Sequence, residues 1–134
     1  MNDSLVRIGF CAAAAFNIAG MLVFTRLFTN EVLFATDPGL FSQQGCILVI
    51  IWGLAYLAQA ASWRAAPWIS AVFAVEKVFF AGSWLLWMSR EAHRLPEISA
   101  ADPLAGAFYG LYGVGDGLFA GFFAWAFIKA RAKK

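Results

Sequence analysis

An acid and a base stand side by side in the apolar stretch AVFAVEKVFFAG, at Glu76 and Lys77. Polar side chains also interrupt three other apolar segments, at Asn17, Tyr56 and Asp116. Residues of these types can form ion pairs, carry protons or hydrogen-bond a ligand. An Asp or Lys at the centre of a membrane helix costs about 2.5 to 3.5 kcal/mol. The chemistry therefore depends on whether the fold brings these residues together.

Composition indicates that the four segments lie in a membrane. Of the 134 residues, 62% are hydrophobic and 13% are charged, against roughly 25% charged residues in an ordinary soluble domain. A helix needs roughly 20 apolar residues to cross the hydrocarbon core. Four segments approach that length, at about residues 5–28, 45–63, 67–88 and 104–128. We expect an all-α integral membrane protein with a single domain (1–134), a four-transmembrane-helix bundle that runs up, down, up and down.

The distribution of Lys and Arg predicts how this bundle is oriented, because cytoplasmic flanks carry an excess of both residues. An even number of spans places both termini on one side. That side holds the larger set, which is Arg7, Arg64, Lys129, Arg131, Lys133 and Lys134, against Arg26, Arg90 and Arg94 on the other. We therefore expect a multi-pass protein of a bacterial-type inner membrane with both termini cytoplasmic. Residues 89–103 form the longest polar stretch and are expected to be a simple connector on the outer side.

Depth places the polar residues of all four segments in one layer. The midpoints of the first, third and fourth segments fall near Asn17, Lys77 and Asp116. Tyr56 and Glu76 lie within about one helical turn of the same level. Grouped in one layer, opposite charges and hydrogen bonds can offset the desolvation that an isolated charge suffers.

Helical angles decide which of these residues can meet. Successive residues diverge by about 100° around a helix, so Glu76 and Lys77 face different neighbours. We expect Lys77 to pair with Asp116, and Glu76 to pair with Tyr56, Asn17 or both. Further residues share the inward faces of the second and fourth segments and complete the candidate ligand-binding cluster: Trp52, Tyr56 and Gln59, and Tyr109, Tyr112 and Asp116.

A face of glycines runs along the fourth segment. Its members recur at three- or four-residue spacing: Gly106, Gly110, Gly113, Gly117 and Gly121. Small residues at such spacing let two membrane helices approach closely. We expect this helix-packing face to lie inside the bundle of a monomer, because Asp116 beside it must face inward. The seam of a homodimer is the alternative.

The residue pattern favours a pocket for a small apolar or amphipathic, lipid-like molecule, since aromatic walls with a few convergent polar groups are typical of ligand sites. A small proton- or ion-coupled transporter working as an oligomer is one alternative. The chain resembles the small multidrug resistance transporters in length alone, because those dimers use a glutamate of the first helix and the first segment here holds Asn17 and no acid. A non-catalytic accessory subunit of a larger membrane complex, with the polar layer holding helices together, is the other alternative.

Several kinds of site have no support in the sequence. His93 is the single histidine and Cys11 and Cys46 are the two cysteines, which do not make a metal-ligand set. No nucleophile elbow or phosphate-binding loop occurs. We therefore assign no catalytic residue and no cofactor, and an enzymatic function is disfavoured. The single basic cluster is the C-terminal KARAKK, so nucleic acid is not an expected partner, whereas membrane lipids are.

Overall fold

The computed structural model describes residues 2–132, and this part of the chain is almost entirely helical, without a strand. Four helices are long: α1 (Asp3–Phe24), α4 (Gln43–Gln59), α5 (Pro67–Glu91) and α7 (Pro103–Arg131). The others are short: α2 (Glu31–Thr36), α3 (Pro38–Phe41), the 3-10 helix η1 (Ala92–Arg94) and α6 (Leu95–Ala101). The fold is therefore all-α, as the sequence predicts.

Local sequence signals set where the long helices begin. The side chains of Asn2, Ser42 and Asp102 accept backbone N–H bonds at the starts of α1, α4 and α7, as N-capping residues do. Pro67 and Pro103 occupy the first turns of α5 and α7. Proline lacks a backbone N–H, and this does no harm there because an N–H in the first turn has no acceptor within the helix. These signals fix the ends of the elements that position the polar layer.

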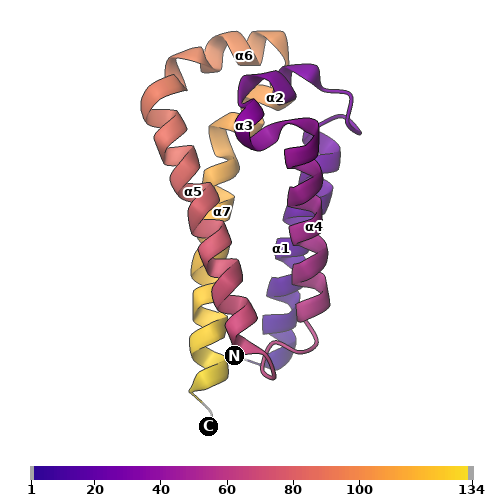
Figure 1. Cartoon of the computed structure of the whole chain (residues 1–134), viewed down its shortest axis with the longest axis vertical. Coiled ribbons are helices and arrows are strands. Elements are labelled where there is room, and N and C mark those ends of the chain that lie inside the picture. The colour runs from indigo at the N-terminus through magenta and orange to yellow at the C-terminus, as the bar shows by residue number, and fades with distance from the viewer. Residues whose placement is uncertain (1, 133–134) are drawn as a thin grey trace.

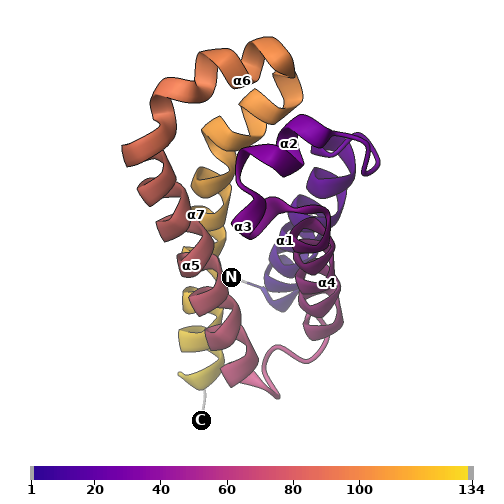
Figure 2. The ribbon, with the colours of Figure 1, turned by 45° about the horizontal axis from the view of Figure 1, so that its top comes forward.

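The four long helices form two pairs. α1 packs along α4 and α5 packs along α7, while α1 also touches α7. Figures 1 and 2 show α1 and α4 on one side of the molecule and α5 and α7 on the other. The turn between Gln59 and Pro67 joins the pairs at one end, and α2, α3 and α6 cover the other end (Figure 1). The space between the pairs must therefore be filled by side chains.

Aromatic side chains fill much of that space in two clusters. Nearer the α4–α5 turn, the ring of Tyr56 lies 4.8 Å from that of Phe73 and 4.9 Å from that of Phe123. Nearer α6, the ring of Phe41 lies 4.8 Å from that of Phe108. Four of the five residues of the polar layer lie outside both clusters: Asn17, Glu76, Lys77 and Asp116.

The helix of the first segment ends at Phe24, about one turn before the expected Phe28, because the chain then makes a left-handed turn. Arg26, Leu27 and Phe28 have φ angles of 50°, 55° and 64°. This conformation costs a non-glycine residue roughly 1 to 2 kcal/mol. Thr25 steadies the turn, since its hydroxyl oxygen accepts the N–H of Phe28 at 3.0 Å.

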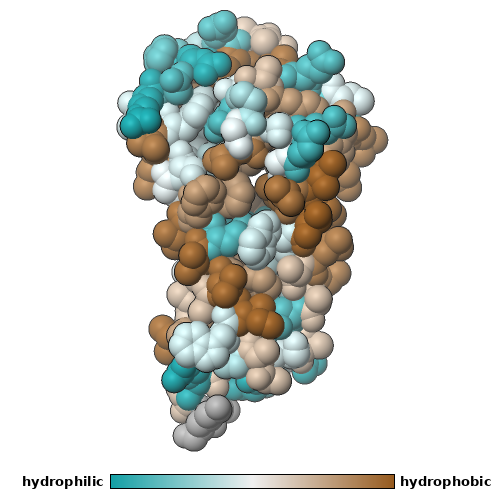
Figure 3. All heavy atoms as spheres, in the orientation of Figure 1, coloured by the Kyte–Doolittle hydropathy of each residue, from teal (hydrophilic) through white to brown (hydrophobic). Residues whose placement is uncertain are grey.

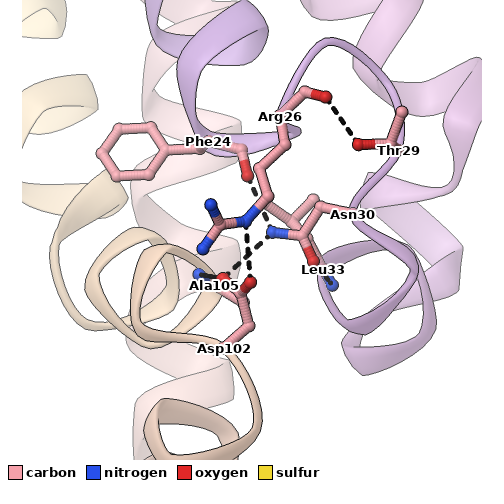
Figure 4. Close-up of polar contacts among 7 residues, drawn as sticks. All are labelled: Phe24, Arg26, Thr29, Asn30, Leu33, Asp102 and Ala105. Carbon is pink, nitrogen blue, oxygen red and sulfur yellow. Dashed lines mark hydrogen bonds and ion pairs between the residues drawn. The ribbon is translucent and has the colours of Figure 1, made fainter.

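Asp102 fastens this turn to the start of α7 (Figure 4). Its carboxylate accepts bonds from Arg26 Nε at 2.9 Å, from Asn30 Nδ2 at 3.1 Å and from the N–H of Ala105 at 2.8 Å. Burial opposes the charge, but the bonds from Ala105, Arg26 and Asn30 outweigh it and hold the pKa of Asp102 below its usual value. One carboxylate therefore ties the end of α1 to the N-terminus of α7.

Residues 89–103 differ from the simple connector that their polarity predicts. α5 continues to Glu91, and η1 and α6 follow before α7 begins at Pro103. Leu95 and Ile98 lie three residues apart and pack into the cluster around Phe41, which gives α6 an apolar face toward the core. Figure 2 shows α6 crossing the end of the bundle.

The outer surface is that of a membrane protein. Among residues 2–132, three helical segments are long and apolar enough to cross a membrane: Asp3–Phe24, Pro67–Ala101 and Pro103–Arg131. α4 is apolar but has 17 residues and is shorter. Figure 3 shows hydrophobic atoms over much of the middle of the molecule and hydrophilic atoms gathered at the end formed by α6. Side chains such as Leu118, which is 72% exposed, suit a surface that faces lipid.

The Asp102 network predicts a pH dependence of stability. Because the pKa of Asp102 is lowered in the folded protein, its contribution is present above the unfolded pKa and is lost as the pH falls through the folded pKa. Asp102→Asn keeps a capping side chain but not the ion pair, whereas Asp102→Ala also loses about 1 kcal/mol from the cap. We expect thermal unfolding in detergent to show a smaller loss of stability on acidification for Asp102→Asn than for wild type.

The matched control is Glu97→Gln, which removes an exposed acid of α6. This variant should keep the pH dependence of the wild type. If Asp102→Asn and wild type lose the same stability on acidification, the carboxylate does not hold the two helix ends together.

Candidate functional site

Lys77 is the centre of the polar layer. Its Nζ donates hydrogen bonds to Asp116 Oδ1 at 2.6 Å and to Asn17 Oδ1 at 2.8 Å. The side chain is 1% exposed, and the rings of Phe16 and Tyr56 lie 5.1 Å and 5.4 Å from Nζ, within the range of a cation–π contact. The expected Lys77–Asp116 pair is therefore present, and Asn17 bonds to Lys77 rather than to Glu76.

Asn17 extends this network to α4. Its Nδ2 donates to the carbonyl oxygen of Val49 on α4 at 3.0 Å. Gly53 makes the close approach of α1 and α4 possible, because a Cβ at this position would lie 2.7 Å from Ile18 Cγ1 and 3.0 Å from Asn17 Cβ. A chain of polar contacts thus links α7, α5, α1 and α4 across the gap between the two helix pairs.

Glu76 makes a separate contact on another side of α5. The hydroxyl of Tyr56 donates to Glu76 Oε2, and Glu76 is 8% exposed. Among residues 2–132, no Lys or Arg lies within ion-pair distance of this carboxyl. Glu76 and Lys77 therefore serve different helices, as their angular separation predicts.

The other candidate residues lie at different places in the bundle. The hydroxyl of Tyr109 donates to a backbone carbonyl of α2 at 2.6 Å, and Gln59 Nε2 donates to a backbone carbonyl of the α4–α5 turn at 2.9 Å. Trp52 is half-buried, with its ring edge-on to Phe73 at 6.1 Å, and lines a groove between α4 and α5. Tyr112 is the member of this set that lies beside the polar layer, because it lines a cavity together with Asn17, Glu76, Lys77 and Asp116.

The glycine face of α7 divides into packed and open positions. A Cβ on Gly106 would collide with Ser99 of α6, and a Cβ on Gly113 would collide with Trp84 of α5. A Cβ on any of the remaining three would meet nothing within 4 Å: Gly110, Gly117 and Gly121. α7 also meets α1 at a glycine outside the expected face, because a Cβ on Gly115 would collide with Phe16.

A cavity of about 210 Å³ adjoins the polar layer. Five polar residues line it: Asn17, Glu76, Lys77, Tyr112 and Asp116. The rest of the lining is apolar and includes the rings of Phe24, Phe41, Phe80 and Phe108. The cavity is therefore amphipathic, with aromatic walls above a charged and hydrogen-bonding floor.

The most exposed lining residues of the cavity belong to α1 and α7. Its lining residues Phe16, Ala107 and Leu111, which come from these two helices, are exposed, and Gly20 is partly exposed. On the opposite wall, Phe41 of α3 and Val49 of α4 are buried. The most accessible wall of the cavity is therefore the one formed by α1 and α7.

The hydroxyl of Tyr112 is a buried polar group without a partner. It makes no hydrogen bond within the described chain, and it belongs to a residue that lines the cavity. The ring is held by stacking on Phe108, with ring centres 5.0 Å apart and planes at 21°. A buried hydroxyl without a partner costs roughly 1 to 3 kcal/mol, so a partner inside the cavity would relieve that penalty. Ser70 Oγ is also unpaired but does not line the cavity.

Sequence patterns do not assign the apolar part of this site. Phenylalanine is a common residue of membrane helices, so Phe24, Phe80 and Phe108 carry no signal of their own. Phe41 lies in a connector, where a core position is not expected. Gly20 offers a faint signal, because an isolated glycine inside a helix loses stability without a packing reason.

Comparison with known proteins leaves the function to be argued from this geometry. No family model matches the chain, and no curated protein or solved structure matches it. Within residues 2–132, no group of three His, Cys, Asp or Glu side chains is placed to hold a metal ion.

The Lys77–Asp116 pair predicts a non-additive pair of substitutions. Lys77→Met should destabilise the protein by about 3 to 5 kcal/mol, because it leaves the Asp116 carboxylate buried without its cation. Lys77→Met combined with Asp116→Leu removes both charges and should recover most of that loss. Unfolding in detergent, followed by circular dichroism, measures both variants.

The control is Lys129→Met near the end of α7, where the same substitution lies outside the layer and should change stability by less than about 1 kcal/mol. Equal losses for Lys77→Met and for the double variant would contradict the pairing.

Proposed function

We propose that the protein is a four-span inner-membrane protein that binds a small amphipathic, lipid-like molecule in the cavity between α1 and α7. One observation carries this proposal: the aromatic walls of the cavity end at the polar layer, and beside that layer the buried hydroxyl of Tyr112 has no hydrogen-bond partner among residues 2–132. Sites for small molecules combine apolar walls with a few fixed polar groups in this way.

The lengths and charges of the helices support four spans with cytoplasmic termini. The 17 residues of α4 rise about 26 Å, a little less than the roughly 30 Å of hydrocarbon, and a bilayer thins locally at small cost to accommodate such a helix. The end of the bundle at the α4–α5 turn carries Arg7, Arg64, Lys129 and Arg131. Lys133 and Lys134 lie outside the described residues. The opposite end carries Arg26, Arg90 and Arg94, so the positive-inside tendency favours the turn end as cytoplasmic.

The size and accessible wall of the cavity support a ligand with one polar end. An apolar cavity of roughly 150 Å³ takes up benzene, so about 210 Å³ holds a somewhat larger group. A longer apolar chain can continue past Gly20 and Leu111 into the lipid. The polar end then lies against the layer, where Tyr112 offers a hydrogen bond.

The position of Glu76 favours a second candidate, a small proton- or ion-coupled transporter. Glu76 and Phe80 line both the cavity and the groove between α4 and α5. Figure 3 shows hydrophilic atoms in the middle of the face formed by these two helices, among mainly apolar atoms. A carboxyl that borders two hollows at mid-depth is suited to exchange a proton or a cation between them.

The open glycines of α7 favour a further helix as partner. Gly110, Gly117 and Gly121 have room beside them, and small residues on an exposed membrane face allow close helix packing. A homodimer, or a place as an accessory subunit in a larger membrane complex, would use this face. Both are compatible with ligand binding, because the open glycines do not line the cavity.

Native mass spectrometry of the protein released from lipid nanodiscs tests ligand binding. We expect the wild-type protein to retain a small molecule and Gly20→Leu to lose it, because leucine fills the accessible side of the cavity. A Cβ at Gly20 meets nothing within 4 Å. Leucine also has a higher helix propensity than glycine, by about 1 kcal/mol or less, so the variant should keep the fold.

The matched control is Gly82→Leu on α5, where a Cβ also meets nothing within 4 Å and the residue lies outside the cavity. This variant should retain the molecule. A wild-type protein that is bare after release from several lipid compositions would contradict the proposal and favour a purely structural polar layer.

A further inference from the structure

The charges that line the cavity are unbalanced. Its ionisable acids and bases are Glu76, Lys77 and Asp116, which is one base against two acids. With all three ionised, the floor of the cavity has a formal charge of minus one. A membrane interior penalises an uncompensated charge, so a bound molecule that brings one positive charge completes the balance.

Lys77 does not offer its charge to a ligand. Its ammonium donates to Asn17 and Asp116, is covered by aromatic rings and is 1% exposed. An anionic head group would have to displace one of these bonds from the layer that joins the helices. The base that lines the cavity is therefore already hydrogen-bonded within the protein and is not available to a ligand.

The unused hydrogen-bonding positions of the site are mainly acceptors. Glu76 accepts one bond, at Oε2 from Tyr56, and Asp116 accepts one, at Oδ1 from Lys77. Within the described chain, each carboxyl accepts this one hydrogen bond, and the hydroxyl of Tyr112, which can donate or accept, has none. An ionised carboxylate can only accept, so the complementary head group is a donor.

The aromatic walls suit a positive head group as well. The rings of Phe16, Phe80, Phe108 and Tyr112 all line the cavity. Ring faces attract ammonium groups, most strongly where water is excluded. Aromatic side chains beside carboxylates are the surroundings in which organic ammonium ions are bound.

We propose that the ligand of this cavity is an amphipathic organic cation, a protonated amine with one apolar chain, whose head lies between Glu76, Asp116 and the hydroxyl of Tyr112. This inference rests on the proposed ligand-binding function. The apolar chain follows the rings of Phe24 and Phe108 toward the accessible wall formed by α1 and α7. The cation binds as an ion, and no covalent step is involved.

Three probes with the same eight-carbon chain test the head group: octylammonium, octanol and octanoate. Each is titrated into wild-type protein in phosphatidylcholine nanodiscs, whose zwitterionic lipid limits adsorption of charged probes to the membrane surface. Native mass spectrometry counts the adducts, and the shift in unfolding temperature gives relative affinity. We expect a single octylammonium adduct that binds at least about tenfold more tightly than octanol, and no octanoate adduct.

Glu76→Gln should abolish the preference for octylammonium over octanol while leaving octanol binding in place, because it removes the negative charge and keeps the shape. Glu97→Gln, an exposed position on α6, should leave the preference unchanged. The comparison of probes on the wild-type protein stands even where Glu76→Gln does not fold.

The outcomes separate this inference from the proposed function. Octanol binding as tightly as octylammonium, with both lost in Gly20→Leu, overturns the cation and leaves the ligand-binding function in place. Preferential binding of octanoate overturns the cation as well. Failure of all three probes to bind overturns the inference and counts against the cavity as a ligand site.

Discussion

The ammonium of Lys77 sets the constraint on which the rest of the structure depends. A cation buried among apolar helices must be satisfied by the protein, and it is satisfied by residues of two other helices, Asp116 of α7 and Asn17 of α1. Asn17 in turn bonds to Val49 of α4. Buried ion pairs seldom add net stability, because desolvation offsets their attraction. We infer that the network specifies which helices meet and at what height, while aromatic packing stabilises the fold.

The cavity follows from the same arrangement. The two helix pairs are joined at one end by the α4–α5 turn, are covered at the other by α2, α3 and α6, and touch each other between α1 and α7. Aromatic clusters fill the space on either side of the polar layer, and the small residues Gly20 and Ala107 line the cavity beside it. A hollow therefore remains where charged and aromatic groups already converge, and this coincidence gives the site its amphipathic character.

Depth and helical angle predict the Lys77–Asp116 pair, which the structure contains. They leave Tyr56, Asn17 or both as partners of Glu76, and the structure pairs Glu76 with Tyr56 and gives Asn17 to Lys77. Other features depend on tertiary contacts that no local pattern encodes: the backbone carbonyl of Val49 as the partner of Asn17, Phe41 inserted from a connector, and α6 in place of a loop. The glycine spacing of α7 indicates close packing, but it does not tell positions that meet α5 or α6 from those that face outward.

The central claim is that Lys77 and Asp116 are in direct contact inside the membrane. Solid-state NMR on the protein in lipid bilayers, with 15N in lysine side chains and 13C in aspartate carboxyl groups, measures this contact through their dipolar coupling. We expect a coupling between Lys77 Nζ and the carboxyl carbon of Asp116, which the Nζ–Oδ1 contact of 2.6 Å brings close together, and we expect this coupling to disappear in the Lys77→Met, Asp116→Leu variant. A wild-type spectrum without a lysine–aspartate coupling that this variant removes would contradict the account.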